Sequence, residues 1–171
     1  NFHFEIGADL LDSECLDFLS SVRPGLFQFE IGVQSTHPQT LSAIHRSAPK
    51  DKLFDNVRAL RTHTPVHLHL DLIAGLPYEN YAAFRQSFNE VYELAPHQLQ
   101  LGFLKVLKGS GLEREKTTFG LVHHTLPPYE VLYTDALSYE DVLRLKGIEE
   151  MTELYYNSGR YGNTLTALLQ L

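Results

Sequence analysis

Residues 65–77 read Pro-Val-His-Leu-His-Leu-Asp-Leu-Ile-Ala-Gly-Leu-Pro. Apolar and polar side chains alternate along this stretch up to Leu72, and a period of two predicts a β-strand. Successive side chains of a strand point to opposite faces, so the leucines share one face while His67, His69 and Asp71 share the other. We expect the apolar face to pack under helices and the second face to present titratable groups.

The same alternation recurs in three other stretches, at residues 2–6, 26–34 and 97–104. Apolar residues at helical spacing separate these predicted strands, at about residues 13–22, 38–46, 51–63 and 79–95. Strands that alternate with helices imply right-handed crossovers and a parallel sheet. Because each strand has one apolar and one largely polar face, we predict an α/β fold. It is a partial (βα) barrel with about four parallel strands, outer helices and a polar concave face that holds a ligand.

Two regions are expected along the chain. Residues 1–110 form the partial barrel, and Gly109-Ser110-Gly111 is a flexible break. Residues 111–171 form a small C-terminal extension, with a short β-ribbon around Pro127-Pro128 and two helices. Ser138 has the character of the N-cap of the first of these helices.

Composition narrows the function. The formal net charge of -7 argues against a nucleic-acid partner or an anionic membrane surface. No apolar run approaches the roughly 18–20 residues that cross a membrane. The single cysteine, Cys15, excludes an internal disulfide framework and fits a reducing compartment, so we expect a cytoplasmic protein in which Cys15 is a packing residue. The chain starts at Asn1, inside a predicted strand, so we expect a piece of a longer protein.

Three polar side chains mark the carboxyl ends of the predicted strands. Glu5, Gln34 and Asp71 lie at or near these ends, where parallel α/β sheets bind their ligands. Two carboxylates and an amide suit hydroxyls and an amine, and a solvated loop mouth is the alternative. Arg46 lies near a helix C-terminus, where it either complements the helix dipole or clamps a ligand carboxylate. The pattern alone favours the interaction with the helix dipole.

His67, His69 and Asp71 also suggest a different class of function. Alternate residues of a strand share a face, and imidazoles suit zinc or iron, so a metal-dependent hydrolase is an alternative. Three such residues on one strand are a weak signal. Buried histidines hydrogen-bonded to neighbours such as Gln98 or Gln100 are more common.

Two runs of sequence resemble a known family. Phe29-Glu-Ile-Gly-Val-Gln-Ser35 and Asp71-Leu-Ile-Ala-Gly-Leu-Pro77, with Leu41 and Arg46 between them, resemble the second half of a radical S-adenosylmethionine (SAM) enzyme core. The resemblance is to the branch that contains oxygen-independent coproporphyrinogen oxidase and the methylthiotransferases, and it covers about residues 2–107. It implies a partial (βα)6 barrel of which the four strands are the third to sixth. The C-terminal region resembles that of some cobalamin-binding members, which makes cobalamin a further expectation.

The resemblance implies a role for each matching residue. Glu5 matches a carboxylate that contacts SAM, and Gln34 an amide near its ribose. Arg46 matches the arginine that meets the methionine carboxylate, and Asp71 the acid that binds the ribose hydroxyls. The backbone near Phe103 would lie by the adenine. The substrate space would be lined by Glu30, His67, His69, Gln98 and Gln100.

The cysteines of the family are the main departure. The family holds a [4Fe-4S] cluster on a CxxxCxxC loop, and one cysteine cannot hold it. We therefore expect a fragment of a radical SAM oxidoreductase that cleaves SAM reductively to a 5′-deoxyadenosyl radical and acts on a small-molecule or unknown substrate. The fragment alone is expected to be inactive, and to pair with a second copy through its exposed first strand. A non-catalytic binding module is a further alternative.

Overall fold

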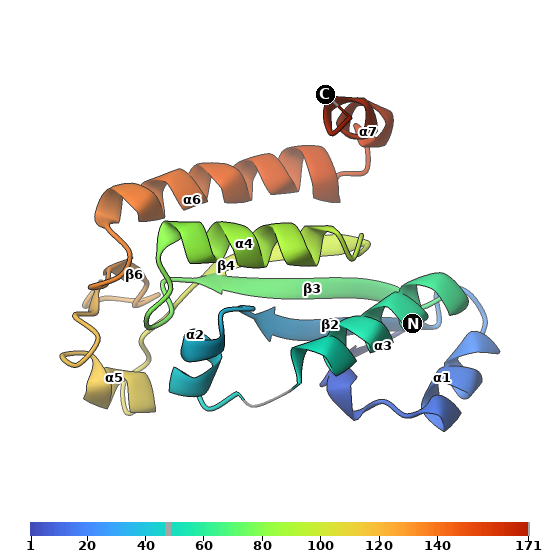
Figure 1. Cartoon of the computed structure of the whole chain (residues 1–171), viewed down its shortest axis with the longest axis horizontal. Coiled ribbons are helices and arrows are strands. Elements are labelled where there is room, and N and C mark those ends of the chain that lie inside the picture. The colour runs from blue at the N-terminus through green and yellow to red at the C-terminus, as the bar shows by residue number, and fades with distance from the viewer. Residues whose placement is uncertain (47–48, 171) are drawn as a thin grey trace.

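The computed structural model describes residues 1–46 and 49–170 and contains a four-stranded parallel sheet in the order β1-β2-β3-β4. The strands are β1 (Phe2–Glu5), β2 (Phe27–Gln34), β3 (His67–Ala74) and β4 (Gln98–Phe103). Neighbouring strands are consecutive in the chain, so each connection is a crossover with a helical segment. The predicted α/β partial barrel is confirmed (Figure 1).

Helices connect the strands and cover the apolar face of the sheet. They are the short 3-10 helix η1 (Ala8–Leu10), α1 (Ser13–Ser20), α2 (Pro38–Ala43), α3 (Lys50–His63) and α4 (Tyr81–Tyr92). Side-chain caps mark the start of two of these helices. Asp12 accepts the N–H of Cys15 at the start of α1, and Asn80 accepts that of Ala83 at the start of α4. Cys15 itself is exposed, so its prediction as a packing residue was wrong.

The core lies between the sheet and these helices. Leu68, Leu70 and Leu72 of β3 are fully buried, as the alternation predicted. Burying one such side chain stabilises the fold by roughly 1.5–3 kcal/mol. The helices supply the partners of this leucine row in the same core cluster, among them Val57, Leu60, Phe84 and Val91.

The C-terminal region adds helices and a ribbon. Its elements are α5 (Gly111–Glu115), β5 (Val122–His123), β6 (Val131–Tyr133), α6 (Tyr139–Met151), the π-helix η2 (Thr152–Asn157) and α7 (Gly162–Leu168). Strands β5 and β6 pair antiparallel, and Ser138 caps α6. The flexible break at residues 109–111 stays a prediction, and its Ser110 is the N-cap of α5. The Ser110 hydroxyl accepts the N–H of Glu113 and caps α5, while the Glu113 carboxylate accepts the N–H of Gly109.

The two edges of the sheet differ. On β4, the side chain of Asn157 takes the place of a further strand: its Oδ1 accepts the N–H of Leu99 and its Nδ2 donates to the carbonyl of Leu99, both at 2.9 Å. On β1, Phe2 and Phe4 are 58% and 46% exposed. An uncovered edge invites strand pairing, so self-association through β1 stays a prediction. Within the described part of the chain, no helix has the length and hydrophobicity of a membrane span.

The two hydrogen bonds between Asn157 and Leu99, which we call the clasp on β4, can be tested by Asn157→Ala. This change leaves the N–H and C=O of Leu99 without their partners, and we expect the free energy of unfolding to fall by about 1–3 kcal/mol. Chemical denaturation measures it. Ser158→Ala is the matched control, because the exposed Ser158 hydroxyl bonds only to neighbouring backbone, donating to Leu154 and accepting from Arg160, and neither bond reaches the sheet. Equal losses in the two variants would contradict the role of the clasp.

Candidate functional site

A cavity of about 870 Å³ lies on the polar face of the sheet. In Figure 1 the arrowheads of β2 and β3 point to the end where α2, α5 and β6 lie. The residues singled out from the sequence that line the cavity are Glu5, Glu30, Gln34, Arg46, Asp71, Gln100 and Phe103. His67, His69 and Gln98 share this face but do not line the cavity. The structure therefore brings together all five residues that the resemblance gave to the cofactor.

Strand register explains why these side chains meet. Glu5 pairs with Glu30, Glu30 with His69, and His69 with Gln98, so one polar row crosses all four strands. The next row toward the carboxyl end runs through Gly32, Asp71 and Gln100. Paired residues of neighbouring strands point to the same face. The period-two pattern of each strand thus becomes a continuous polar surface.

A bulge at the end of β2 shapes the middle of this surface. The register with β3 shifts between Gly32 and Gln34, and Gln34 has a positive φ of 68°. A Cβ added at Gly32 would lie 2.2 Å from Nε2 of Gln34, so the amide occupies the space that glycine leaves. Arg46 Nη1 donates to the carbonyl of Gly32 at 2.6 Å. Because Gly32 has no side chain, the Gln34 amide and the Arg46 guanidinium can both approach it. The positive φ of Gln34 is a backbone outlier, and such outliers cluster at functional sites.

Asp71 is the most perturbed group in the cavity. Burial raises the pKa of Asp71 to about 7, and the nearby carboxylates of Glu30 and Glu5 add to the rise. His69 Nε2 lies 3.1 Å from Asp71 Oδ1, although the two atoms do not meet hydrogen-bond geometry. Burial also lowers the pKa of His69. Near neutral pH the Asp71 carboxyl is therefore partly protonated, and it can donate as well as accept hydrogen bonds from a ligand.

The metal-hydrolase alternative gains no support from the geometry. His67 stacks on His97, with ring centroids 4.8 Å apart, and burial lowers its pKa. Over residues 1–46 and 49–170, no three His, Cys, Asp or Glu side chains are placed to hold a metal ion.

Part of the cavity wall was missed by sequence reasoning. Lys146 Nζ lies 4.2 Å from the ring centroid of Phe103 and donates to Glu130 at 2.5 Å. Glu149 and Glu153 follow on the same C-terminal segment and also line the cavity. No signal in the sequence marks these residues, because they reach the sheet only through the packing of the C-terminal region, with α6 and η2 beside β4.

Solved structures resemble this arrangement. Coproporphyrinogen III oxidase HemN from Escherichia coli, a radical SAM enzyme, aligns with a TM-score of 0.63 and 18% identity, over 90% of this chain and 32% of HemN. The sheet has the fold of the partial barrel of these radical SAM enzymes. The radical SAM methyltransferase TsrM from Kitasatospora setae, solved with tryptophan and a SAM analog, aligns with a TM-score of 0.58 and 15% identity, over 74% of this chain and 26% of TsrM.

Sequence comparisons support the same radical SAM resemblance. The oxygen-independent coproporphyrinogen-III oxidase-like protein HemZ of Bacillus subtilis is 32% identical over 89 residues, 52% of this chain and 18% of HemZ. The oxygen-independent coproporphyrinogen III oxidase of Synechocystis sp. is 29% identical over 84 residues, 48% of this chain and 18% of that protein. The chain thus spans about a fifth of these relatives. A model described as a protein of unknown function, DUF4080, matches residues 117–171.

The raised pKa of Asp71 makes a prediction about stability. The folded protein holds the Asp71 proton up to about pH 7, whereas the ordinary pKa is 3.8. Its contribution to the free energy of unfolding is therefore present at low pH and is lost as the pH rises from about 4 through 7. In Asp71→Asn this loss is absent, so the difference between wild type and variant changes with pH. Urea denaturation across pH 4–8 checks this.

Asp55→Asn on the exposed surface of α3 is the control for that series. Its pH dependence should follow the wild type. If the Asp71→Asn curve runs parallel to the wild-type curve over the whole range, the carboxyl of Asp71 does not titrate as described.

Proposed function

We propose that the polar face of the sheet binds S-adenosylmethionine, and that the chain contributes this site to a radical SAM oxidoreductase. One observation carries the proposal: Glu5, Gln34, Arg46 and Asp71 come from separate parts of the chain and line one cavity on a radical SAM fold. Their chemistry also differs in a way that suits the different groups of one ligand.

The fit of SAM to these residues can be argued group by group. The Glu5 carboxylate suits the amine of the methionine moiety, and the planar guanidinium of Arg46 suits its carboxylate. One nitrogen of Arg46 already donates to Gly32, which fixes the fork and leaves further N–H groups for a ligand. The Asp71 carboxyl and the Gln34 amide suit ribose hydroxyls. When bound, SAM supplies the radical chemistry from which the family takes its name.

The iron–sulfur cluster does not fit the residues present. Cluster irons are held by several cysteine thiolates, and the only cysteine of this sequence, Cys15, is exposed on α1. The proposal therefore requires three cysteines spaced CxxxCxxC elsewhere in the gene product. A gene that encodes none would contradict it.

Further parts of the proposal concern the whole protein. TsrM was solved with cobalamin and a [4Fe-4S] cluster, so we include cobalamin among the cofactors to be tested. The substrate we propose is a small molecule held on the same polar face, beside Glu30 and Gln100. We place the protein in the cytoplasm, where a lone exposed cysteine stays reduced.

Calorimetric titration of the full-length gene product with SAM tests the site. Asp71→Ala should weaken binding by roughly 1–3 kcal/mol, about five- to 150-fold, because it leaves ligand hydroxyls without partners. Asp55→Ala, on the exposed side of α3, is the control and should bind as wild type does. No heat of binding in the wild type, or an unchanged dissociation constant in Asp71→Ala, would contradict the proposal.

A further inference from the structure

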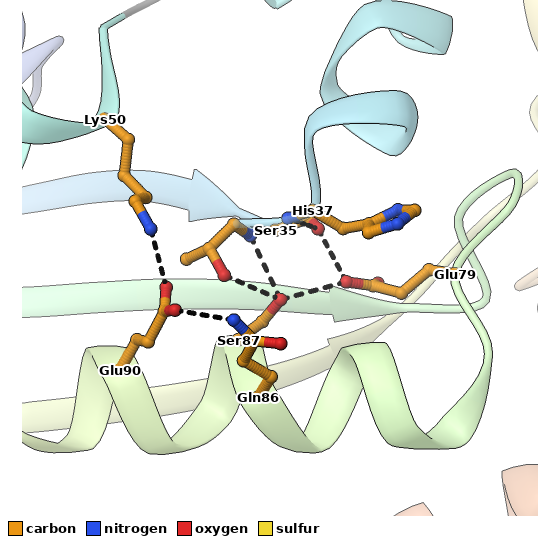
Figure 2. A network of polar contacts seen from close by, with 8 residues as sticks. Ser35, His37, Lys50, Glu79, Gln86, Ser87 and Glu90 are labelled. Atoms are coloured by element: carbon orange, nitrogen blue, oxygen red, sulfur yellow. Dashed lines mark hydrogen bonds and ion pairs between the residues drawn. The ribbon is translucent and has the colours of Figure 1, made fainter.

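A buried network of hydroxyl groups converges on Glu79, which lies in the loop between β3 and α4 (Figure 2). Glu79 is 1% exposed. Its Oε1 accepts from the hydroxyl of Ser35 at 2.5 Å and from that of Ser87 at 3.0 Å. Ser35 belongs to the loop after β2 and Ser87 to α4. One carboxyl oxygen therefore joins three segments at the carboxyl end of the sheet.

The two serine hydroxyls also accept hydrogen bonds from the backbone of the β2–α2 loop, and so link Glu79 to that loop. Ser35 Oγ accepts the N–H of His37 at 3.0 Å. Ser87 Oγ accepts the N–H of Thr36 at 3.0 Å and faces its hydroxyl at 3.1 Å. Each serine donates its own proton to Glu79, which leaves its lone pairs to the loop. Without Glu79 neither hydroxyl has a fixed orientation.

A second contact ties the same two loops. Thr40, fully buried at the start of α2, donates from its hydroxyl to the carbonyl of Pro77 at 2.8 Å. Gln34 directly precedes the tied segment and Arg46 follows α2, while Pro77 closes the run that begins at Asp71. The network therefore ties the loop that follows Gln34, at the end of β2, to the loop that follows β3, the strand on which Asp71 lies.

Glu79 serves both serines as a hydrogen-bond acceptor. Among the residues that the structure describes, no lysine, arginine or histidine forms an ion pair with it, and its Oε2 has no hydrogen-bond partner. Burial raises the pKa of Glu79 to about 7, against the opposite effect of the Ser35 and Ser87 hydroxyls. A neutral amide has the same shape and keeps the acceptor oxygen that both serines use.

We propose that Glu79 is a positioning residue of the SAM site: through Ser35 and Ser87 it holds the loop after Gln34 against the end of β3. The assignment rests on the proposed function as far as SAM is concerned, and on the hydrogen bonds alone as far as the loop is concerned. Glu79 touches no ligand itself, since it does not line the cavity.

The experiment compares Glu79→Ala, Glu79→Gln and wild type in the full-length gene product. Hydrogen exchange at the amides of Thr36 and His37 reports on the loop, and calorimetry reports on SAM. In Glu79→Ala we expect exchange at both amides to be at least tenfold faster and the dissociation constant for SAM to rise at least tenfold. Glu79→Gln should restore both to within about threefold of wild type, because it keeps the acceptor oxygen.

Two controls separate positioning from general stability. Val57→Ala removes buried volume from α3, away from these loops, and should lower the melting temperature without changing SAM affinity or exchange at Thr36 and His37. Ser87→Ala removes one arm of the network and should speed exchange at Thr36; it decides the question if Glu79→Ala does not fold.

The outcomes distinguish this inference from the proposed function. If wild type does not bind SAM, the proposed function fails, and the exchange data still decide whether Glu79 holds the loop. If Glu79→Ala, or Ser87→Ala in its place, matches wild type in both readouts, the positioning role is overturned. Equal losses in Glu79→Gln and Glu79→Ala would overturn it as well.

Discussion

The burial of Leu68, Leu70 and Leu72 under the helices is the constraint on which the structure depends. Parallel strands are usually apolar on both faces, because helices cover both. Here only one face is apolar, so burying it directs every intervening side chain to the other side of the sheet. The polar rows through His69 and Asp71 follow from this packing. Fold stability and the assembly of the site therefore come from the same alternation.

Two carboxyl groups, Asp71 and Glu79, have similarly raised pKa values but different surroundings. Burial raises the pKa of both Asp71 and Glu79 to about 7, yet their surroundings differ. Asp71 faces the cavity with other carboxylates near it, which leaves it available to a ligand. Glu79 accepts hydrogen bonds from two serine hydroxyls, so its bonded oxygen is occupied within the protein. Perturbed carboxyls gather at functional sites, but only the geometry separates a group that binds from one that holds its neighbours.

Sequence reasoning predicted the features of the fold that follow from the alternation of apolar and polar residues. It located four parallel strands and placed Glu5, Gln34 and Asp71 at one end of the sheet. Arg46 stayed ambiguous, because its partner is the carbonyl of Gly32, and a backbone contact leaves no trace in residue pattern. The network of Glu79 was missed for the same reason, since its serine partners lie 44 and 8 residues away along the chain. Sequence reasoning therefore missed the contacts that form only when distant segments pack together.

Gly75, in the loop after β3, is needed both by the sheet region and by the C-terminal ribbon. Gly75 has a positive φ of 87°, and a Cβ there would lie 2.6 Å from a methyl of Val131 in β6. The glycine is thus required by its own backbone and by the ribbon that packs on it. Asn157 meanwhile pairs with the β4 edge at Leu99, whereas β1 pairs with β2 alone among the described strands, so the edge at β1 is the one more open to a further strand.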